Sequence, residues 1–179
     1  MRAFDKRLRA YLYASLFCAL TVVGAYIRIP LVPPITLQFL FTNVSALVLG
    51  RRFGALSVLL YITLGLAGLP VFTFGGGIGS VLSPTFGYTL GLLVGAYLGG
   101  AVAQKSKSTP ALVAASLLNM LAVYVFGCAH FLFIKNLYLS ETVSISESIA
   151  VCILPFILFD VIKAAISILL AKRLYKIIG

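Results

Sequence analysis

Apolar residues fill most of this chain in long stretches, separated by short segments rich in proline, glycine or basic residues. The stretches predict six spanning or nearly spanning helices, because a helix needs roughly 20 apolar residues to cross a bilayer. Their approximate positions are 10–27, 37–49, 53–69, 85–102, 110–134 and 149–171. The second is short, so we expect it to be extended by residues 34–36, to stand upright, or to be buried among its neighbours.

The composition is typical of an integral membrane protein. Of the 179 residues, 61% are hydrophobic and only 10% are charged, and the mean hydropathy is +1.12, whereas soluble domains have about 25% charged residues. We therefore predict an all-α integral membrane protein with a single membrane domain over residues 1–179. Cys18, Cys128 and Cys152 are scattered in apolar runs, which predicts packed thiols rather than a disulfide framework or a metal site.

Basic residues are distributed unequally between alternate loops. One side of the predicted membrane domain holds Arg2, Lys6, Arg7, Arg9, Arg51, Arg52, Lys105, Lys107, Lys172, Arg173 and Lys176. The other side holds only Arg28 and Lys135. Because cytoplasmic loops are enriched in Lys and Arg, we expect both termini in the cytoplasm. The net charge of +10 is then a signal of topology, and we predict no nucleic-acid partner.

Two ionisable residues interrupt the last apolar stretch. Asp160 and Lys163 are three positions apart, so they share one face of a helix and can interact. Asp160 lies about 16 Å from the start of the stretch, which is half the thickness of the hydrocarbon core. A charge at that depth costs about 2.5–3.5 kcal/mol even on lenient insertion scales. The pair is either a structural ion pair or, as we favour, part of a substrate site.

Residue patterns for catalysis are missing. The chain has no G-x-x-x-x-G-K-[ST] phosphate loop, and the glycine run at 75–79 does not complete a dinucleotide-binding motif. No carboxylate lies within a helical turn of His130, which favours a packed or pore-lining side chain over a general base. We predict no enzyme, no cofactor and no metal site. The glycine run is a flexible surface loop or, as we favour, a backbone close to a ligand, with the amides of Gly76 and Gly77 free to bind it.

A succession of short blocks resembles one known family. The blocks are I-T-L-Q (35–38), L-G-R-R-F-G-A-L-S (49–57), G-L-A-G-L-P-V-F (65–72), G-G-G (75–77), S-P-T-F-G-Y (83–88) and F-D-x-x-K (159–163). In this order they resemble the BioY family, the biotin-binding membrane subunits of energy-coupling-factor (ECF) transporters, over about residues 10–170. Phe86 departs from the family pattern, which commonly has glycine there, and Thr73 and Phe74 stand where small residues are common. These side chains are expected to narrow the mouth of the pocket.

The resemblance implies a six-helix subunit of a prokaryotic plasma membrane, surrounded by lipid, with a biotin pocket open to the outside. It also implies a transmembrane coupling subunit and two cytoplasmic ATPases as partners. The chemistry of biotin agrees, because Asp160 can accept from the two ureido N–H groups and Lys163 can donate to the ureido carbonyl. Candidates for meeting the biotin carboxylate are the glycine-loop amides, Tyr88, Thr85, Arg28 and Lys135, and the residues alone do not choose between them.

Other polar and small residues have two interpretations each. Gln38, Asn43 and Asn119 lie at membrane depth and are expected mainly as hydrogen-bond partners between helices, with Gln38 kept as a candidate substrate contact. Ala10 and Ala14 are small residues at a four-residue spacing, which lets another helix approach closely. The resemblance implies that this helix docks on the coupling subunit, and packing within the chain is the alternative.

Two other functions remain open at this point. A subunit of the same class could bind thiamine or riboflavin, although the absence of Trp and the single acid within the membrane favour biotin. A small structural membrane protein could use the Asp160–Lys163 pair only to join helices. Competition between vitamins for binding distinguishes the first alternative from a biotin-binding subunit. A ligand-binding assay distinguishes the second, because a purely structural protein would bind no vitamin.

Overall fold

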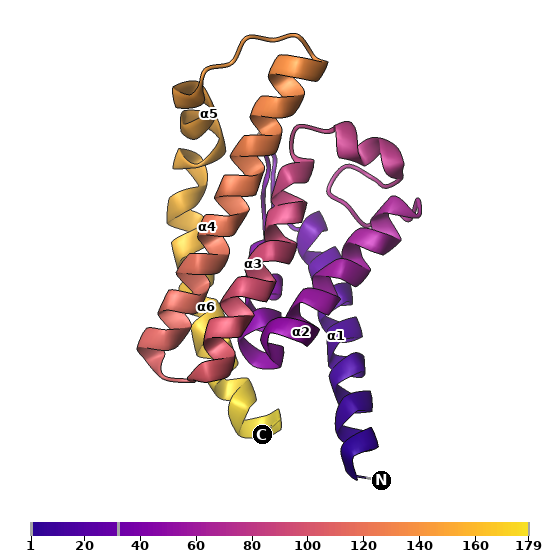
Figure 1. Ribbon diagram of the computed structural model, residues 1–179, viewed down its shortest axis with the longest axis vertical. Coiled ribbons are helices and arrows are strands. Elements are labelled where there is room, and N and C mark those ends of the chain that lie inside the picture. The colour runs from indigo at the N-terminus through magenta and orange to yellow at the C-terminus, as the bar shows by residue number, and fades with distance from the viewer. Residues whose placement is uncertain (1, 32, 179) are drawn as a thin grey trace.

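Six α-helices make up most of the computed structural model, which describes residues 2–31 and 33–178 (Figure 1). They are α1 (Arg2–Tyr26), α2 (Gln38–Leu66), α3 (Phe86–Lys105), α4 (Thr109–Phe133), α5 (Ile145–Cys152) and α6 (Leu154–Ile178). Within the described residues, five of these helices, all but α5, are long and apolar enough to cross a membrane. The prediction of an all-α membrane protein is therefore confirmed, with five candidate spans among the described residues where six spanning or nearly spanning helices were predicted.

Helix α2 turns back on itself at Gly50. This residue has φ 73° and ψ −174°, a backbone conformation that glycine adopts without steric cost. The hydroxyl oxygens of Ser45 and Ser57 lie 3.0 Å apart, although twelve positions along a straight helix would separate them by about 18 Å. Helix α2 thus consists of two antiparallel halves that meet at Gly50. This agrees with the prediction of separate helices over residues 37–49 and 53–69. The short first half is buried among its neighbours from Phe39 to Leu47, apart from the half-buried Phe41.

Helices α3 and α4 approach each other through a row of glycines. Gly87, Gly91, Gly95 and Gly99 recur at every fourth position and so share one face of α3. A Cβ atom on Gly91 would lie 2.6 Å from the Cα of Val123, and one on Gly95 would overlap the side-chain oxygen of Asn119. Only glycine allows this approach. We did not predict the contact, although the spacing is a known signal of close packing in membranes.

Buried amide side chains join the first half of α2 to α4. Asn43 donates to the hydroxyl of Ser116 at 2.9 Å, and Asn119 donates to the side-chain oxygen of Asn43 at 3.1 Å. All three side chains are buried. The expectation that Asn43 and Asn119 are hydrogen-bond partners between helices is confirmed.

The predicted last helix, residues 149–171, is not continuous. Helix α5 ends at Cys152 and α6 begins at Leu154, with Ile153 at φ −123° and ψ −54° between them. Pro155 explains the break, because it has no N–H with which to continue the hydrogen bonds of α5. Asp160 therefore lies about 9 Å along α6, nearer to the helix start than an unbroken helix would place it.

The segment predicted as a polar loop, residues 135–147, is largely structured. A π-helical turn (Ile134–Tyr138) extends α4, and α5 begins with a capping box. In this box the Glu147 N–H donates to the Ser144 hydroxyl at 3.2 Å, and Glu147 accepts from the Ser144 backbone N–H at 2.7 Å. The bonds from the Ser144 N–H and hydroxyl hold the pKa of the exposed Glu147 below its usual value. Their contribution is present at neutral pH and is lost as the pH falls through that lowered pKa.

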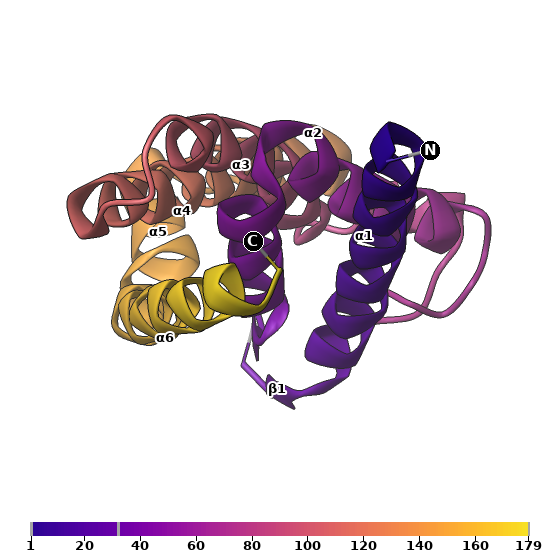
Figure 2. The same ribbon diagram turned by 90° about the horizontal axis from the view of Figure 1, so that it is seen from below.

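The two termini lie at one end of the molecule, and the long connections lie at the other (Figure 1). There the proline-rich stretch forms a small antiparallel hairpin, β1 (Arg28–Ile29) with β2 (Ile35–Thr36), in which Arg28 pairs with Thr36. We expected this stretch only to end the first helix. Figure 2 shows that the hairpin connects α1 to the rest of the bundle, with α1 and α6 on opposite sides of the view. A 3₁₀-helix (Ile78–Leu82) begins within the glycine run at the same end.

The small residues of α1 face the inside of the chain. Ala14 has no exposed surface and Ala10 is half-buried, and α1 packs on α2. This burial favours packing within the chain as the role of Ala14, rather than docking on a partner.

We expect Ala14→Trp to destabilise the isolated protein, because an indole cannot enter a fully occupied helix interface without displacing backbone. Overpacking of this kind costs about 1–3 kcal/mol. The measurement is the thermal unfolding midpoint in detergent. Leu12→Trp is the matched control, since Leu12 is 61% exposed on the same helix. Equal midpoints for the two variants would contradict the packing role.

Candidate functional site

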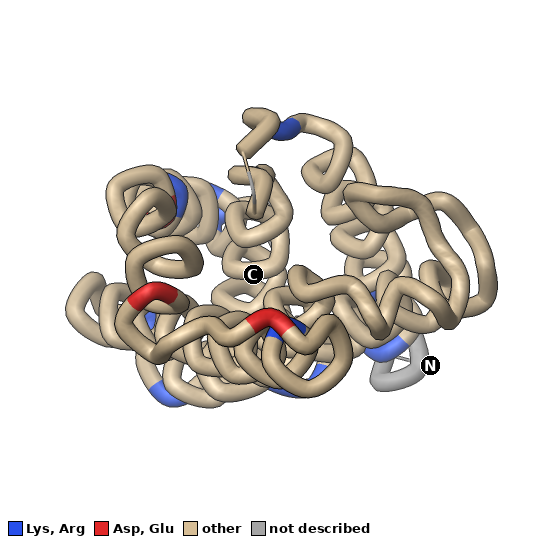
Figure 3. Tube along the Cα trace, turned by 90° about the horizontal axis from the view of Figure 1, so that it is seen from above, with Lys and Arg blue, Asp and Glu red and all other residues tan. Residues whose placement is uncertain are grey.

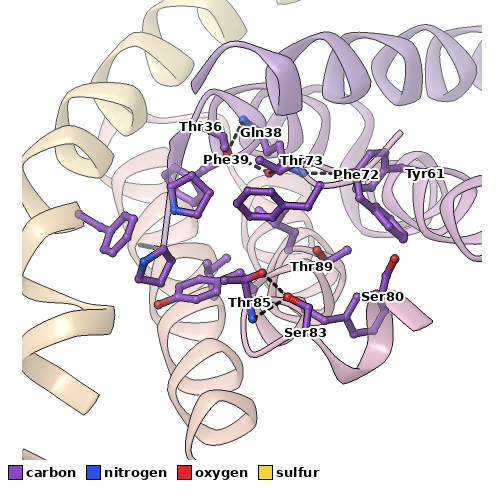
Figure 4. Close-up of a pocket in the computed structure, with 18 of the residues that line it drawn as sticks. Thr36, Gln38, Phe39, Tyr61, Phe72, Thr73, Ser80, Ser83, Thr85 and Thr89 are labelled. Carbon is purple, nitrogen blue, oxygen red and sulfur yellow. Dashed lines mark hydrogen bonds between the residues drawn. The ribbon is translucent and has the colours of Figure 1, made fainter. Parts of the chain in front are cut away.

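A cavity of about 410 Å³ opens among the connections at the end of the molecule opposite the termini (Figure 4). This volume lies within the range of small-molecule sites, about 300–1,000 Å³. Its walls come from the β2 region, both halves of α2, the 72–85 connection, α3, α4 and α6. The lining residues are Pro33, Pro34, Thr36, Gln38, Phe39, Tyr61, Phe72, Thr73, Phe74, Gly76, Gly79, Ser80, Ser83, Thr85, Phe86, Tyr88, Thr89, Leu92, Val123, Phe156, Asp160 and Lys163.

The charged wall of the cavity is the pair Asp160 and Lys163, which are 5% and 7% exposed. The Lys163 ammonium contacts Asp160 Oδ1 and donates to the backbone oxygen of Thr36 at 3.0 Å. Asp160 Oδ2 accepts from the hydroxyl of Tyr124 at 2.7 Å. A buried charge without partners would be very costly, and here each charge has two.

This pairing leaves a defined bonding capacity toward the cavity. An ammonium group has three donors, and the protein occupies two of those on Lys163. Each carboxylate oxygen of Asp160 takes one protein bond and retains a further lone pair. The site therefore suits a ligand group that offers one acceptor beside N–H donors.

Gln38 lies in the cavity wall, where its amide connects three segments. Its amide nitrogen donates to the Tyr61 hydroxyl at 2.6 Å, across the two halves of α2. Its amide oxygen accepts from Thr36 at 2.9 Å and from Thr73 at 3.4 Å. Figure 4 shows this group at one side of the cavity. Gln38 thus has the expected interhelical role and also borders the space where a ligand would lie.

The two predicted glycines differ in their positions. Gly76 lines the cavity, and a Cβ there would overlap the backbone oxygen of Leu69. Gly77 does not line it, and its N–H donates to the backbone oxygen of Gly65 at 2.7 Å. The expectation of a free Gly77 amide is therefore wrong, because the N–H closes the loop onto the end of α2.

Hydroxyl groups form the wall across from Gln38 in Figure 4. Thr85 and Ser83 face each other with hydroxyl oxygens 2.9 Å apart, and both line the cavity. Tyr88 also lines it, but its hydroxyl donates to the backbone oxygen of Cys152 at 2.8 Å. His130 is packed behind this wall, with Nε2 3.1 Å from the carbonyl of Val81. This contact joins the hydroxyl-bearing wall to α4, and it agrees with the prediction that His130 is a packed side chain.

Aromatic rings supply the apolar walls. Tyr61 and Phe72 meet edge to face with centroids 5.3 Å apart, and Phe72 meets Phe86 in the same way at 5.9 Å. Phe86 is buried, so it forms an inner wall rather than narrowing the mouth as expected. Phe74 is 68% exposed and lies at the rim.

The two outer cations do not line the cavity, although Arg28 contacts two residues that do. Arg28 donates to the Thr73 backbone oxygen, and its guanidinium lies 5.1 Å from the centre of the Phe74 ring. Lys135 pairs with Glu141 at 2.6 Å. Neither side chain lines the cavity, so among the candidates for meeting a ligand carboxylate only Thr85, Tyr88 and glycines of the 75–79 run lie in its wall.

Comparison with known proteins identifies the family. The profile of the BioY family matches residues 1–179. The chain belongs to the BioY family. It is 40% identical over 172 residues to the biotin transporter BioY of Thermotoga maritima, which covers 95% of this chain and 98% of the relative. It is 39% identical to the probable biotin transporter BioY of Lysinibacillus sphaericus, over 91% of this chain and 85% of the relative.

A solved BioY-like fold agrees with the sequence match. The crystal structure of the S-component for biotin from an ECF-type ABC transporter superposes with a TM-score of 0.83 at 27% identity. The match covers 96% of this chain and 93% of that structure. The resemblance inferred from the sequence blocks is thereby confirmed.

Several residues at the site of this BioY chain were not predicted, three in the cavity wall and one, Tyr124, behind it. Phe156 precedes Asp160 by four residues and so shares its helix face, a signal that the sequence contains. Phe39 directly follows the I-T-L-Q block. Val123 and Tyr124 have no comparable signal, because only the packing of α4 against α6 brings them to the site.

Proposed function

We propose that this chain is a biotin-binding membrane subunit that mediates biotin uptake. The observation on which the proposal rests is a buried Asp160–Lys163 pair in the wall of an aromatic-lined cavity, in a chain of the BioY family. A subunit with this role captures and moves its ligand without changing it covalently, so the chain is a transport protein and not an enzyme.

The ureido ring of biotin fits the bonding capacity of the ion pair. Asp160 accepts from the ureido N–H groups with its remaining lone pairs, and the third Lys163 donor meets the ureido carbonyl. Because the ion pair is buried, a ligand that lacks one of these groups leaves a buried hydrogen-bonding group unsatisfied, which gives specificity. The aromatic wall of Tyr61, Phe72 and Phe86 takes the thiophane ring and the aliphatic tail.

The carboxylate of biotin is assigned to the hydroxyl wall. Thr85 and Ser83 are cavity-lining donors, and Ser80 and Gly76 line the same cavity. The engagement of the Tyr88 hydroxyl with Cys152 makes it an aromatic wall residue in this assignment. Arg28 and Lys135 act elsewhere, in the loop contact with Phe74 and in the ion pair with Glu141.

The orientation proposed for the subunit places the cavity outside the cell. The excess of Lys and Arg lies on the side of the termini, which makes that side cytoplasmic. Figure 3 views the molecule from the opposite end, to which only Arg28 and Lys135 of the basic loop residues are assigned. In this arrangement the subunit sits in the plasma membrane among lipids and works with an ECF transmembrane coupling subunit and two cytoplasmic ATPases, which drive transport.

Isothermal titration of biotin into the purified protein tests the ligand. We expect tight binding at a ratio of one to one, and no detectable heat from thiamine or riboflavin at the same concentrations. Failure of a well-folded sample to bind biotin would overturn the proposal. Tight binding of thiamine or riboflavin instead would identify that vitamin as the ligand.

A further inference from the structure

Tyr124 approaches the proposed site from outside the cavity. It lies on α4, next to the cavity-lining Val123, but does not itself line the cavity. Its side chain is only 6% exposed, and its hydroxyl donates to Asp160 Oδ2 at 2.7 Å. This length is typical of a strong hydrogen bond from a hydroxyl to a charged oxygen.

The two oxygens of Asp160 are held from different parts of the fold. Lys163, on the same helix, occupies Oδ1, and Tyr124 on α4 occupies Oδ2. Lys163 is itself fixed by the backbone oxygen of Thr36 in β2. A carboxylate rotates easily about its last side-chain torsion. Contact with Lys163 alone would therefore leave the orientation of the carboxylate plane undefined. Tyr124 removes that freedom.

We propose that Tyr124 is a positioning residue for ligand recognition, which orients the Asp160 carboxylate and keeps its remaining lone pairs directed into the cavity. This inference deepens the proposed function and rests on it. A carboxylate fixed before the ligand arrives avoids the ordering cost that binding would otherwise pay, so affinity for the ligand rises. Because Tyr124 donates, Asp160 presents acceptors to the cavity, which selects ligands that offer N–H groups.

The test is a double-mutant cycle on biotin affinity, measured by titration. Tyr124→Phe removes only the hydroxyl, and we expect binding to weaken about tenfold, the size of effect typical of one hydrogen bond to a charged group. In the Asp160→Asn background, Tyr124→Phe should cause less than a twofold further loss, because the group through which it acts is already changed. A structural role would instead lower the thermal midpoint and give the same loss in both backgrounds.

Tyr175→Phe is the matched control. Its hydroxyl also makes one interhelical bond, a part-buried one to the backbone oxygen of Leu47 at 2.5 Å, but Tyr175 does not line the cavity. We expect its biotin affinity to equal that of the wild type. Wild-type affinity in Tyr124→Phe, or a tenfold loss that persists in the Asp160→Asn background, would overturn the positioning role. Absence of biotin binding by the wild type would instead overturn the proposed function itself.

Discussion

Asp160→Asn should weaken biotin binding by at least about 100-fold. The substitution removes the charge that accepts from the ligand and leaves the Lys163 ammonium buried without its counter-charge. Hydrogen bonds to a charged group contribute about 1.5–3 kcal/mol each, and about 1.4 kcal/mol corresponds to a tenfold change in affinity. Loss of two such bonds to the ureido ring therefore accounts for the expected effect. The measurement is titration calorimetry in detergent or in nanodiscs.

An unfolding artefact must be separated from loss of recognition, because breaking a buried ion pair costs about 3–5 kcal/mol. The double variant Asp160→Asn, Lys163→Met removes both charges and should restore the thermal midpoint toward that of the wild type. Its biotin binding should remain at least about 100-fold weaker than that of the wild type. Binding by Asp160→Asn within threefold of the wild type would contradict the assignment of Asp160 to the ligand.

Gly91→Leu should prevent α3 and α4 from packing. The added Cβ would lie 2.6 Å from the Cα of Val123 and 3.0 Å from the Ala122 carbonyl oxygen, so the obstruction is backbone rather than a movable side chain. Overpacking usually costs about 1–3 kcal/mol, and a backbone obstruction places this variant at or above the upper end of that range. We expect little monodisperse protein on size-exclusion chromatography and a strongly lowered thermal midpoint.

Tyr97→Leu is the control for this effect, because it places leucine at a position of α3 that is 47% exposed. It should retain the yield and midpoint of the wild type. If Gly91→Leu behaved in the same way, the close approach of the two helices would not be required for the fold.

Some features of the site and its surroundings could be predicted from the sequence and others could not, for physical reasons. Asp160 and Lys163 stood out because charge inside an apolar stretch is costly wherever that stretch packs. The Gly77 prediction was wrong because a glycine run does not reveal which amides close the loop onto itself, and here that bond goes to Gly65. Ala14 illustrates the same difficulty, because small residues at a four-residue spacing favour close approach without specifying which helix approaches.

The sequence alone determined the helical membrane class, the turn near Gly50 and the charged pair at the centre of the site, since each depends on local composition or spacing. It also carried the family resemblance in its ordered blocks. Only the tertiary structure decided that Tyr124 reaches Asp160 from α4, thirty-six positions away in sequence. Contacts of that kind depend on how helices pack against one another, and no pattern along a single helix specifies them.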